Sequence, residues 1–221
     1  YGTDPRTEKY YVCAEGDAGG YGGKPNEDGE SALFCMNLGD TYNVPAEVVE
    51  VRYPWRVERF ELAQDSGGAG KFRGGLGVHR NYQIIGHKAG LTVTTDRVKC
   101  CPPWGIFGGK QGKPSLTVIY RKDGKEERWR KISNLPIAPD EIISFQTGGG
   151  GGYGSPLERD PEKVLQDVIN GYVSLKRSRE DYGVVIDEPE MTLNVEATKK
   201  LRKQMKKSEP ENNNDVIQNC D

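Results

Sequence analysis

Glycine is concentrated in three segments of this chain, and no other feature constrains the fold as much. In the first segment, 65–77 (DSGGAGKFRGGLG), glycine takes six of the last eleven positions, and Lys71 and Arg73 lie between the glycines. The second segment is 103–109 (PWGIFGG) and the third is 148–154 (GGGGGYG). Glycine loses more backbone freedom on folding than any other residue, so this density indicates a backbone that takes positive φ or closely approaches another group. The three segments therefore predict a specific architecture of loops and not a linker.

The rest of the chain up to residue 157 has the pattern of short strands joined by turns. Its apolar runs are rich in Val, Ile, Thr, Tyr and Phe and are bounded by turn residues. Within 56–63 the alternation favours burial of the face that carries Phe60. The Asp-Gly pair within 122–125 is typical of a hairpin turn. Strands are predicted at 31–36, 46–52, 56–63, 77–85, 89–95, 115–120 and 141–147.

Beyond these strands the pattern becomes helical. Asp160, followed by proline, is a helix cap, and the apolar stripe after it ends at Gly171. Ser174 caps a second short helix that ends near Gly183, and a last strand is expected at 184–186.

The last part of the chain differs in composition from the rest. Residues 187–193 are acidic and contain proline, which indicates a linker. Asn194 is a cap for a helix at 195–207, which carries six Lys or Arg residues and one Glu. This helix either docks on an acidic partner or is simply solvated. Residues 208–221 are predicted to be disordered.

The overall composition excludes several classes of protein. The 221 residues allow a sizeable core, and the net charge of −2 provides no global attraction to nucleic acid or to an anionic membrane. No apolar run approaches the ~20 residues of a membrane span, and the first residues lack the pattern of a secretory signal. We therefore expect a soluble cytoplasmic protein that binds neither nucleic acid nor membrane.

The cysteines and histidines do not form a metal-binding pattern. The five cysteines are an odd number, and without a secretory signal they argue against a disulfide framework. A zinc site needs paired ligands, and besides Cys100 and Cys101 the chain offers only His79 and His87. We expect no metal within this chain and interpret the cysteine pair as small buried side chains that enter a loop.

Motifs for nucleotide binding and for serine catalysis are incomplete. A P-loop is excluded because Phe72 follows Gly70-Lys71. Residues 149–154 match the letters of a dinucleotide fingerprint, but the next helix starts too late for a strand–turn–helix unit. The chain has no Gly-x-Ser-x-Gly motif, and its histidines lack a positioned partner, so they are interpreted as structural or surface residues.

Asp96 and Arg97, at the end of a predicted strand, are the candidate catalytic pair. Such a pair either orients a substrate carboxylate or amide through charge-assisted hydrogen bonds or pins the following loop as an ion pair. In that loop, Trp104 and Phe107 either wall a pocket or cover the core. The residues alone thus predict a glycine-rich β domain with a helical tail and do not identify a reaction.

Several long motifs in a fixed order resemble the C-terminal third of the hydantoinase B/5-oxoprolinase family. The resemblance covers about residues 1–186. Its main motifs are 65–77, 96–109 (DRVKCCPPWGIFGG) and 147–160 (TGGGGGYGSPLERD). Shorter ones are GTDPRT at 2–7, GGYGG at 19–23, YNVPAE at 42–47 and DYGVV at 181–185.

The resemblance implies an enzyme of more than one subunit. ATP is bound by a larger A-type subunit, which phosphorylates the substrate, and the B-type protein completes the reaction at a metal-dependent site. Hydantoinases and oxoprolinases open a cyclic amide, whereas the related acetone and acetophenone carboxylases form a β-keto acid. Phosphorylation supplies the leaving group that an amide or a ketone lacks. A cyclic amide hydrolase is expected first, a ketone carboxylase second, and a non-catalytic structural subunit of such a complex third.

This sequence lacks the N-terminal part in which the family's metal-ligating Asp and His residues lie. We therefore expect no catalysis from this chain alone and no cofactor bound by it. ATP/Mg and a divalent metal are expected elsewhere in a hetero-oligomer. Its other members would be the A-type subunit and, as a separate chain, the remaining N-terminal part of the B-type protein.

The expected fold is α+β and mostly β. A glycine-rich β-sandwich-like or barrel-like domain is expected at 1–157, a short helical segment at 158–186, and a linker, basic helix and polar tail at 187–221. Asp96 and Arg97 are the expected catalytic residues. The residues expected to line a substrate site or channel are Gly68, Lys71, Arg73, Trp104, Gly105, Gly150 and Tyr153.

Overall fold

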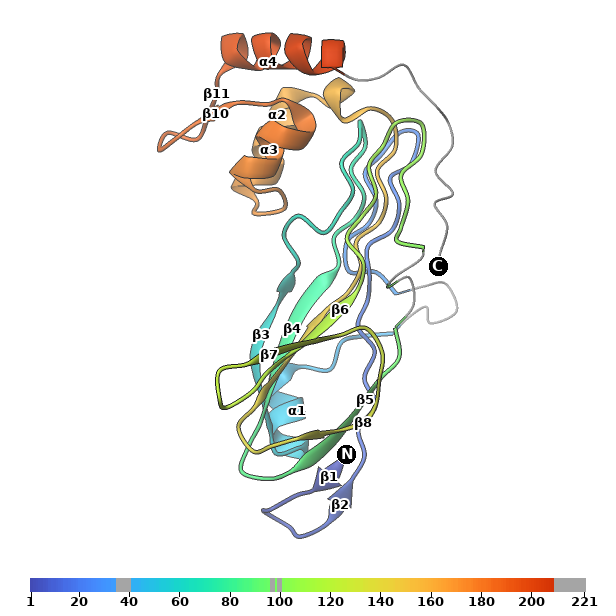
Figure 1. Cartoon of the computed structure of the whole chain (residues 1–221), viewed down its shortest axis with the longest axis vertical. Helices are drawn as coiled ribbons and strands as arrows, with labels where there is room; N and C mark the ends of the chain where they lie inside the picture. The colour runs from blue at the N-terminus through green and yellow to red at the C-terminus, as the bar shows by residue number, and fades with distance from the viewer. Residues whose placement is uncertain (35–40, 96–97, 99–100, 209–221) are drawn as a thin grey trace.

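The structure, a computed structural model, describes residues 1–34, 41–95, 98 and 101–208. These residues form three antiparallel sheets and four α-helices. Figure 1 shows the two larger sheets at one end of the molecule, three of the helices at the other, and long glycine-rich segments between them. The fold is mostly β with helices near the C-terminus, as the sequence predicts. Each helix within the described ranges is too short or too polar to span a bilayer.

The larger sheet has five strands in the order β3-β4-β9-β6-β7. The predicted hairpin turn at 122–125 joins β6 to β7, and Gly124 has the positive φ of +80° that such a turn needs. Along β4 the side chains alternate strictly between buried and half-buried, so this central strand has one inner face. The strands are β3 (Trp55–Leu62), β4 (Val78–Ile84), β9 (Ile142–Gln146), β6 (Leu116–Tyr120) and β7 (Glu126–Trp129).

The second sheet has four strands in the order β2-β1-β5-β8. Buried isoleucines of β4, β6, β8 and β9 join the two sheets through one core, as in a sandwich. The described strands form no closed barrel, so of the two predicted arrangements only the sandwich-like one is present. The strands are β1 (Gly2–Thr3), β2 (Tyr10–Tyr11), β5 (Ala89–Val93) and β8 (Ile132–Ile137).

Two predictions in the N-terminal half are wrong. Residues 46–52, predicted as a strand from their valines, form the helix α1 (Ala46–Arg52). The helix follows Pro45, has Glu47 in its first turn and buries only Val49, so position on the surface outweighs β propensity. In place of a strand at 31–36, the described part has one isolated bridge, between Leu33 and Gly19, and the remainder lies outside the described residues.

The predicted burial of the face of Phe60 is also wrong. Phe60 is 45% exposed because the pairing of β3 with β4 shifts between Val57 and Arg59, and this bulge breaks the simple alternation. The Arg80 guanidinium instead lies over the Phe60 ring, with Arg80 Cζ 4.0 Å from the centroid of the ring.

The glycine-rich segments lie side by side above the sheets (Figure 1). We call residues 19–23, 66–77, 104–112 and 148–154 the glycine bundle. Its segments are joined by backbone hydrogen bonds outside the named strands. Examples are Gly23 N to Gly151 O at 2.8 Å, Gly68 N to Gly150 O at 2.8 Å, Gly75 N to Tyr21 O at 2.7 Å and Lys110 N to Ala69 O at 2.7 Å.

Most positions in the glycine bundle require glycine because two backbones approach each other closely there, and not because φ is positive. A Cβ atom on Gly150 would lie 1.8 Å from the carbonyl oxygen of Tyr21, and one on Gly75 would lie 1.8 Å from that of Glu30. Neither residue has positive φ. Among the glycines of the bundle only Gly108 and Gly154 do, so the two reasons foreseen for the glycine density apply to different positions.

The three helices near the C-terminus begin at the residues that the sequence predicts as caps. Asp160 caps α2 (Pro161–Ile169), with Oδ1 accepting a hydrogen bond from Glu162 N at 3.0 Å. Ser174 caps α3 (Leu175–Tyr182), and Gly183 ends it in the left-handed conformation. Asn194 accepts a hydrogen bond from Ala197 N at the start of α4 (Val195–Ser208).

Residues 187–193, whose composition indicates a linker, instead belong to a small hairpin. Its strands are β10 (Ile186–Asp187) and β11 (Thr192–Leu193). The hairpin leads into α4, where Arg202 donates hydrogen bonds to the carbonyl oxygens of Tyr182 and Arg159. Tertiary hydrogen bonds therefore hold this basic helix against the preceding helices.

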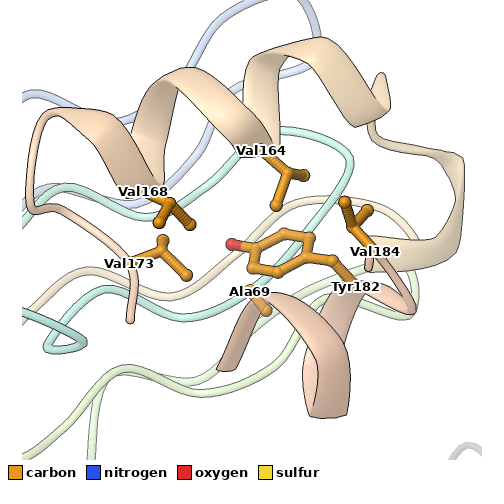
Figure 2. Packing of buried hydrophobic residues seen from close by; sticks show 6 residues of the cluster. All are labelled: Ala69, Val164, Val168, Val173, Tyr182 and Val184. Carbon is orange, nitrogen blue, oxygen red and sulfur yellow. The ribbon is translucent and has the colours of Figure 1, made fainter. Parts of the chain in front are cut away.

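A second hydrophobic cluster connects the helices to the glycine bundle. Figure 2 shows the Tyr182 ring of α3 among valines, with Ala69 of the bundle beside it. Tyr182 is 2% exposed and Ala69 is 1% exposed. The members of the cluster are Ala69, Val164, Val168, Val173, Tyr182 and Val184.

Candidate functional site

A cavity of about 1170 Å³ lies between the two larger sheets and reaches the glycine bundle. Much of its wall is apolar, including Leu91 of β5 and Ile143 and Phe145 of β9. Gly150 and Trp104 of the bundle also line it. A concave, mostly apolar space with a few polar groups at one end is typical of a site for a small ligand.

The ionisable side chains Glu15, Asp17 and Tyr82 of the cavity wall meet at Arg80, and we call these four residues the Arg80 cluster. Arg80 Nη1 lies 3.1 Å from Glu15 Oε2, 3.2 Å from Asp17 Oδ1 and 2.8 Å from the Tyr82 hydroxyl. The Tyr82 hydroxyl donates a short hydrogen bond to Glu15 Oε2. Glu15, Asp17 and Tyr82 line the cavity, and the side chain of Arg80 is only 5% exposed behind them.

Local sequence explains why the side chains of each pair share a face, and tertiary contacts bring the two pairs together. Arg80 and Tyr82 are two residues apart on β4, so both point to its inner face. Glu15 and Asp17 are also two residues apart, on a segment that precedes the glycine bundle. The two pairs meet although they are far apart in the sequence, because Gly20 N donates to Gly148 O, which fixes that segment beside β9.

The electrostatic balance of the cluster is negative. One guanidinium faces two carboxyl groups. Glu15 accepts a hydrogen bond from Arg80 and another from the Tyr82 hydroxyl, whereas Asp17 accepts none within the cluster. Burial raises the pKa of Asp17, although the charge of Arg80 opposes this shift. Burial also raises the pKa of Tyr82, so its hydroxyl stays protonated and acts as a donor. The cluster thus presents an acceptor-rich edge to an apolar cavity.

The structure separates the glycines predicted to line a site. A Cβ atom on Gly68 would lie 2.1 Å from Lys110 O, and one on Gly105 would lie 2.2 Å from Gly109 O. Both residues therefore serve the packing of the bundle, and neither lines the cavity. Gly150 has the same tight backbone contact and also lines the cavity.

Arg73 lies in a separate buried network, which we call the Arg159 cluster: Arg159, Arg73, Asp28 and Asp167. Arg159 donates to Asp28 at 2.6 and 2.7 Å and to Asp167 at 2.8 Å. Arg73, 5% exposed, lies 3.4 Å from Asp167 and donates to Gly74 O at 2.8 Å. This cluster fastens α2 to the glycine bundle.

The remaining predicted residues lie at the surface. Tyr153 pairs with Phe72 through two backbone hydrogen bonds, and its ring centroid is 5.2 Å from that of Phe107. Lys71 Nζ lies 3.9 Å from Glu158. Trp104 is 64% exposed yet lines the cavity, so of its two foreseen roles the structure supports the pocket wall.

The predicted catalytic pair, Asp96 and Arg97, lies outside the described residues, as does Cys100. The flanking Thr95 and Pro103, which are described, both line the cavity. No group of three or more His, Cys, Asp or Glu side chains suited to a metal ion exists in the described ranges.

Each histidine has a structural partner. Arg59 donates to His79 Nδ1 at 3.3 Å, so Nε2 carries the proton and donates to the Ser144 hydroxyl at 2.9 Å. In this tautomer His79 is no base for Ser144, which is also only 1% exposed. His87 donates from Nδ1 to Ile85 O at 2.9 Å and accepts from the Tyr11 hydroxyl at Nε2 at 2.6 Å.

The comparison with protein families agrees with this architecture. Residues 1–156 match the family model for hydantoinase B/oxoprolinase. The chain belongs to this family. The B component of a putative D-/L-hydantoinase from Pseudomonas sp. (strain NS671) is 34% identical over 198 residues, which are 89% of this chain and 33% of that protein.

Solved structures of two enzymes share the fold of this family member. The ATP-dependent caprolactamase from Pseudomonas jessenii matches 84% of this chain and 32% of its own, with a TM-score of 0.72 and 34% identity. A nucleotide-free acetone carboxylase matches 86% of this chain and 30% of its own, with a TM-score of 0.76 and 20% identity, a likeness of fold alone. The chain thus spans about a third of the length of these relatives.

Sequence reasoning missed the Arg80 cluster altogether. The sequence contains one indication of it, because Glu15 and Asp17 are two residues apart in one segment and Arg80 and Tyr82 are two residues apart in a predicted strand. Each pair identifies side chains that share a face. Neither pair identifies the other, because their contact depends on how the glycine bundle aligns distant segments.

Proposed function

We propose that this chain forms part of an ATP-dependent hydantoinase/oxoprolinase-type amidohydrolase, which opens a cyclic amide after phosphorylation by an A-type subunit. The observation that carries the proposal is the cavity, whose largely apolar wall and acceptor-rich Arg80 cluster suit a small ring with a polar side. The relatives named as a hydantoinase component and as a caprolactamase support the same reaction class.

In this proposal the chain acts within a hetero-oligomer and is inactive by itself. Its partners are the A-type subunit, which binds ATP/Mg, and the remaining N-terminal part of the B-type protein, which holds a divalent metal. The length of the relatives, about three times that of this chain, supports the need for further parts.

We assign proposed roles to the residues singled out above. Asp96 and Arg97 orient the substrate; Thr95, which precedes them in the sequence, lines the cavity. Trp104 and Gly150 wall the cavity. The residues that hold the loops in place are Gly68, Lys71, Arg73, Gly105 and Tyr153.

The alternative is a subunit of a ketone carboxylase, which the likeness of fold to acetone carboxylase favours. ATP hydrolysis by the complex purified from its source separates the two. Hydrolysis stimulated by lactams without bicarbonate supports the amidohydrolase. Hydrolysis that needs both a ketone and bicarbonate supports the carboxylase.

A third possibility is a purely structural subunit. Asp96→Ala and Trp104→Ala test it in the assembled complex. We expect at least a tenfold loss of turnover per assembled complex, since oriented polar and stacking groups contribute roughly 1–3 kcal/mol. Unchanged turnover with an altered yield of complex would favour the structural role.

A further inference from the structure

Asp17 is the carboxyl group of the Arg80 cluster that lacks a hydrogen bond. Glu15 accepts from Arg80 at 3.1 Å and from the Tyr82 hydroxyl, whereas the contact of Asp17 with Arg80 is an ion pair of 3.2 Å without hydrogen-bond geometry. Asp17 Oδ1 is inaccessible to solvent and has no hydrogen-bond partner. Asp17 is therefore the carboxyl group of the cluster that is short of hydrogen-bond donors, and it lines the cavity.

The orientation of Asp17 determines which atom a ligand meets. Because Oδ1 is inaccessible and faces Arg80, the 15% of the side chain that is exposed belongs to its other atoms, Oδ2 among them. Asp17 lines the cavity, and Oδ2 has no hydrogen bond within the described part of the chain. Oδ2 is thus the accessible acceptor at this place.

The backbone around Asp17 is held firmly. Thr147 Oγ1 donates to the carbonyl oxygen of Ala18 at 2.7 Å, and Gly20 N donates to Gly148 O at 2.9 Å. Ala18 itself is 4% exposed. The carboxyl group is therefore preorganised by its attachment to the glycine bundle, which lowers the entropic cost of binding.

We propose that Asp17 Oδ2 accepts a hydrogen bond from the ring N–H of a cyclic amide, which phosphorylation of the carbonyl oxygen leaves in place as an iminium N–H, and so selects cyclic amides over ketones. This inference rests on the proposed function, which it deepens. A ring N–H supplies Oδ2 with a donor, and the ring methylenes meet apolar wall residues such as Leu91 and Phe145. A ketone offers Asp17 only further acceptor or apolar atoms, which leaves Oδ2 without a hydrogen-bond donor.

The electrostatics of the cluster agree with this role. Burial raises the pKa of Asp17, which is the direction expected for a carboxyl group short of donors. Arg80 stays paired with Glu15 if Asp17 is replaced, so a variant at Asp17 leaves no isolated buried cation. The position is therefore suited to mutation without loss of the fold.

The test compares a lactam with its N-methylated form in the purified complex. The probes are 2-pyrrolidinone, ε-caprolactam and hydantoin with their N-methyl analogues, and the readout is the ratio of kcat/KM for the N–H form to that for the N-methyl form. We expect Asp17→Ala to lower this ratio roughly 10- to 100-fold, the range for a hydrogen bond to a charged group. Asp17→Asn, which keeps a neutral acceptor, should retain part of the preference.

Glu190→Gln is the matched control, because Glu190 is an exposed carboxylate far in sequence from the cluster. It should leave the ratio unchanged. An unchanged ratio in Asp17→Ala overturns the role of Asp17 while lactam-stimulated ATP hydrolysis leaves the proposed function standing. If Asp17→Ala does not assemble, an unchanged ratio in Asp17→Asn has the same meaning. Absence of stimulation by every lactam overturns both proposals.

Discussion

The β-sandwich and the glycine bundle are held together in opposite ways. In the sandwich, buried side chains such as Ile119 (0% exposed) and Ile143 pack into one core between two sheets, beside the cavity. In the bundle, backbones touch directly, and carbonyl oxygens occupy the positions where a Cβ would stand. The sandwich depends on the volume of its side chains, and the bundle depends on their absence.

The comparison shows that the dense glycine runs of this chain allow backbone segments to pack directly against one another. The bundle gains backbone hydrogen bonds between segments, and its core has no room for a methyl group beside most of them. Its close spacing also places the segment of Asp17 beside β9 and so shapes the cavity. We therefore expect the two regions to respond differently to the same kind of substitution.

The largest effect is expected from Gly150→Ala. The new Cβ would lie 1.8 Å from the Tyr21 carbonyl oxygen, a backbone atom that cannot move alone. We expect the free energy of unfolding to fall by more than about 4 kcal/mol, a loss typical only of severe core damage. Urea unfolding measures this change.

Gly22→Ala is the matched control for that prediction. Gly22 belongs to the same bundle, but its nearest neighbour, Gly151 O, would lie 3.7 Å from the Cβ, an ordinary contact. A change within about 1 kcal/mol is expected. Equal losses in the two variants would show that glycine matters here for backbone freedom and not for spacing.

A smaller effect is expected for a comparable change in the sandwich. Ile119→Ala removes buried side-chain atoms and leaves a cavity, which costs about 2–5 kcal/mol, and Ile119→Val costs about 1 kcal/mol. Thermal unfolding of both variants measures these two losses of stability, and the loss should increase with the number of side-chain atoms removed. If Ile119→Val were as harmful as Gly150→Ala, the contrast between a tolerant and an intolerant region would not hold.

A further prediction, at the low end of the range given for Ile119→Ala, concerns the Arg159 cluster, where the bundle meets α2. Burial opposes ionisation of Asp28, but hydrogen bonds and the charge of Arg159 outweigh it and lower the pKa of Asp28. Its contribution to stability is therefore complete above the unfolded pKa of about 3.9 and is lost as the pH falls below that value toward the folded pKa. Asp28→Asn should cost about 2 kcal/mol at pH 7.

The pH dependence provides the check. The difference in stability between the wild type and Asp28→Asn should shrink as the pH falls from about 5 through the acid range, measured by urea unfolding at each pH. Asp167 has the opposite tendency, because burial raises its pKa against the attraction of Arg73 and Arg159. A difference that stays constant with pH would contradict an ionised Asp28.

Local rules determined much of this fold. The caps at Asp160 and Ser174, the left-handed glycine at Gly183 and the Asp-Gly turn were all predictable, because each depends on a few neighbouring residues. The failures at 46–52 and at Phe60 have the opposite origin. A surface helix and a β-bulge there depend on what packs nearby, which propensity and alternation do not contain.

The sequence by itself determined the family, the mostly β architecture and the presence of glycine segments that bring backbones close together. Only the tertiary structure decided which segments meet, and therefore that Glu15 and Asp17 contact Arg80 and Tyr82 at the cavity. It also placed Arg73 in a buried ionic cluster and Trp104 at the cavity. The physical reason is that glycine has no side chain to encode a partner, so the register of the bundle follows from backbone hydrogen bonds between distant segments.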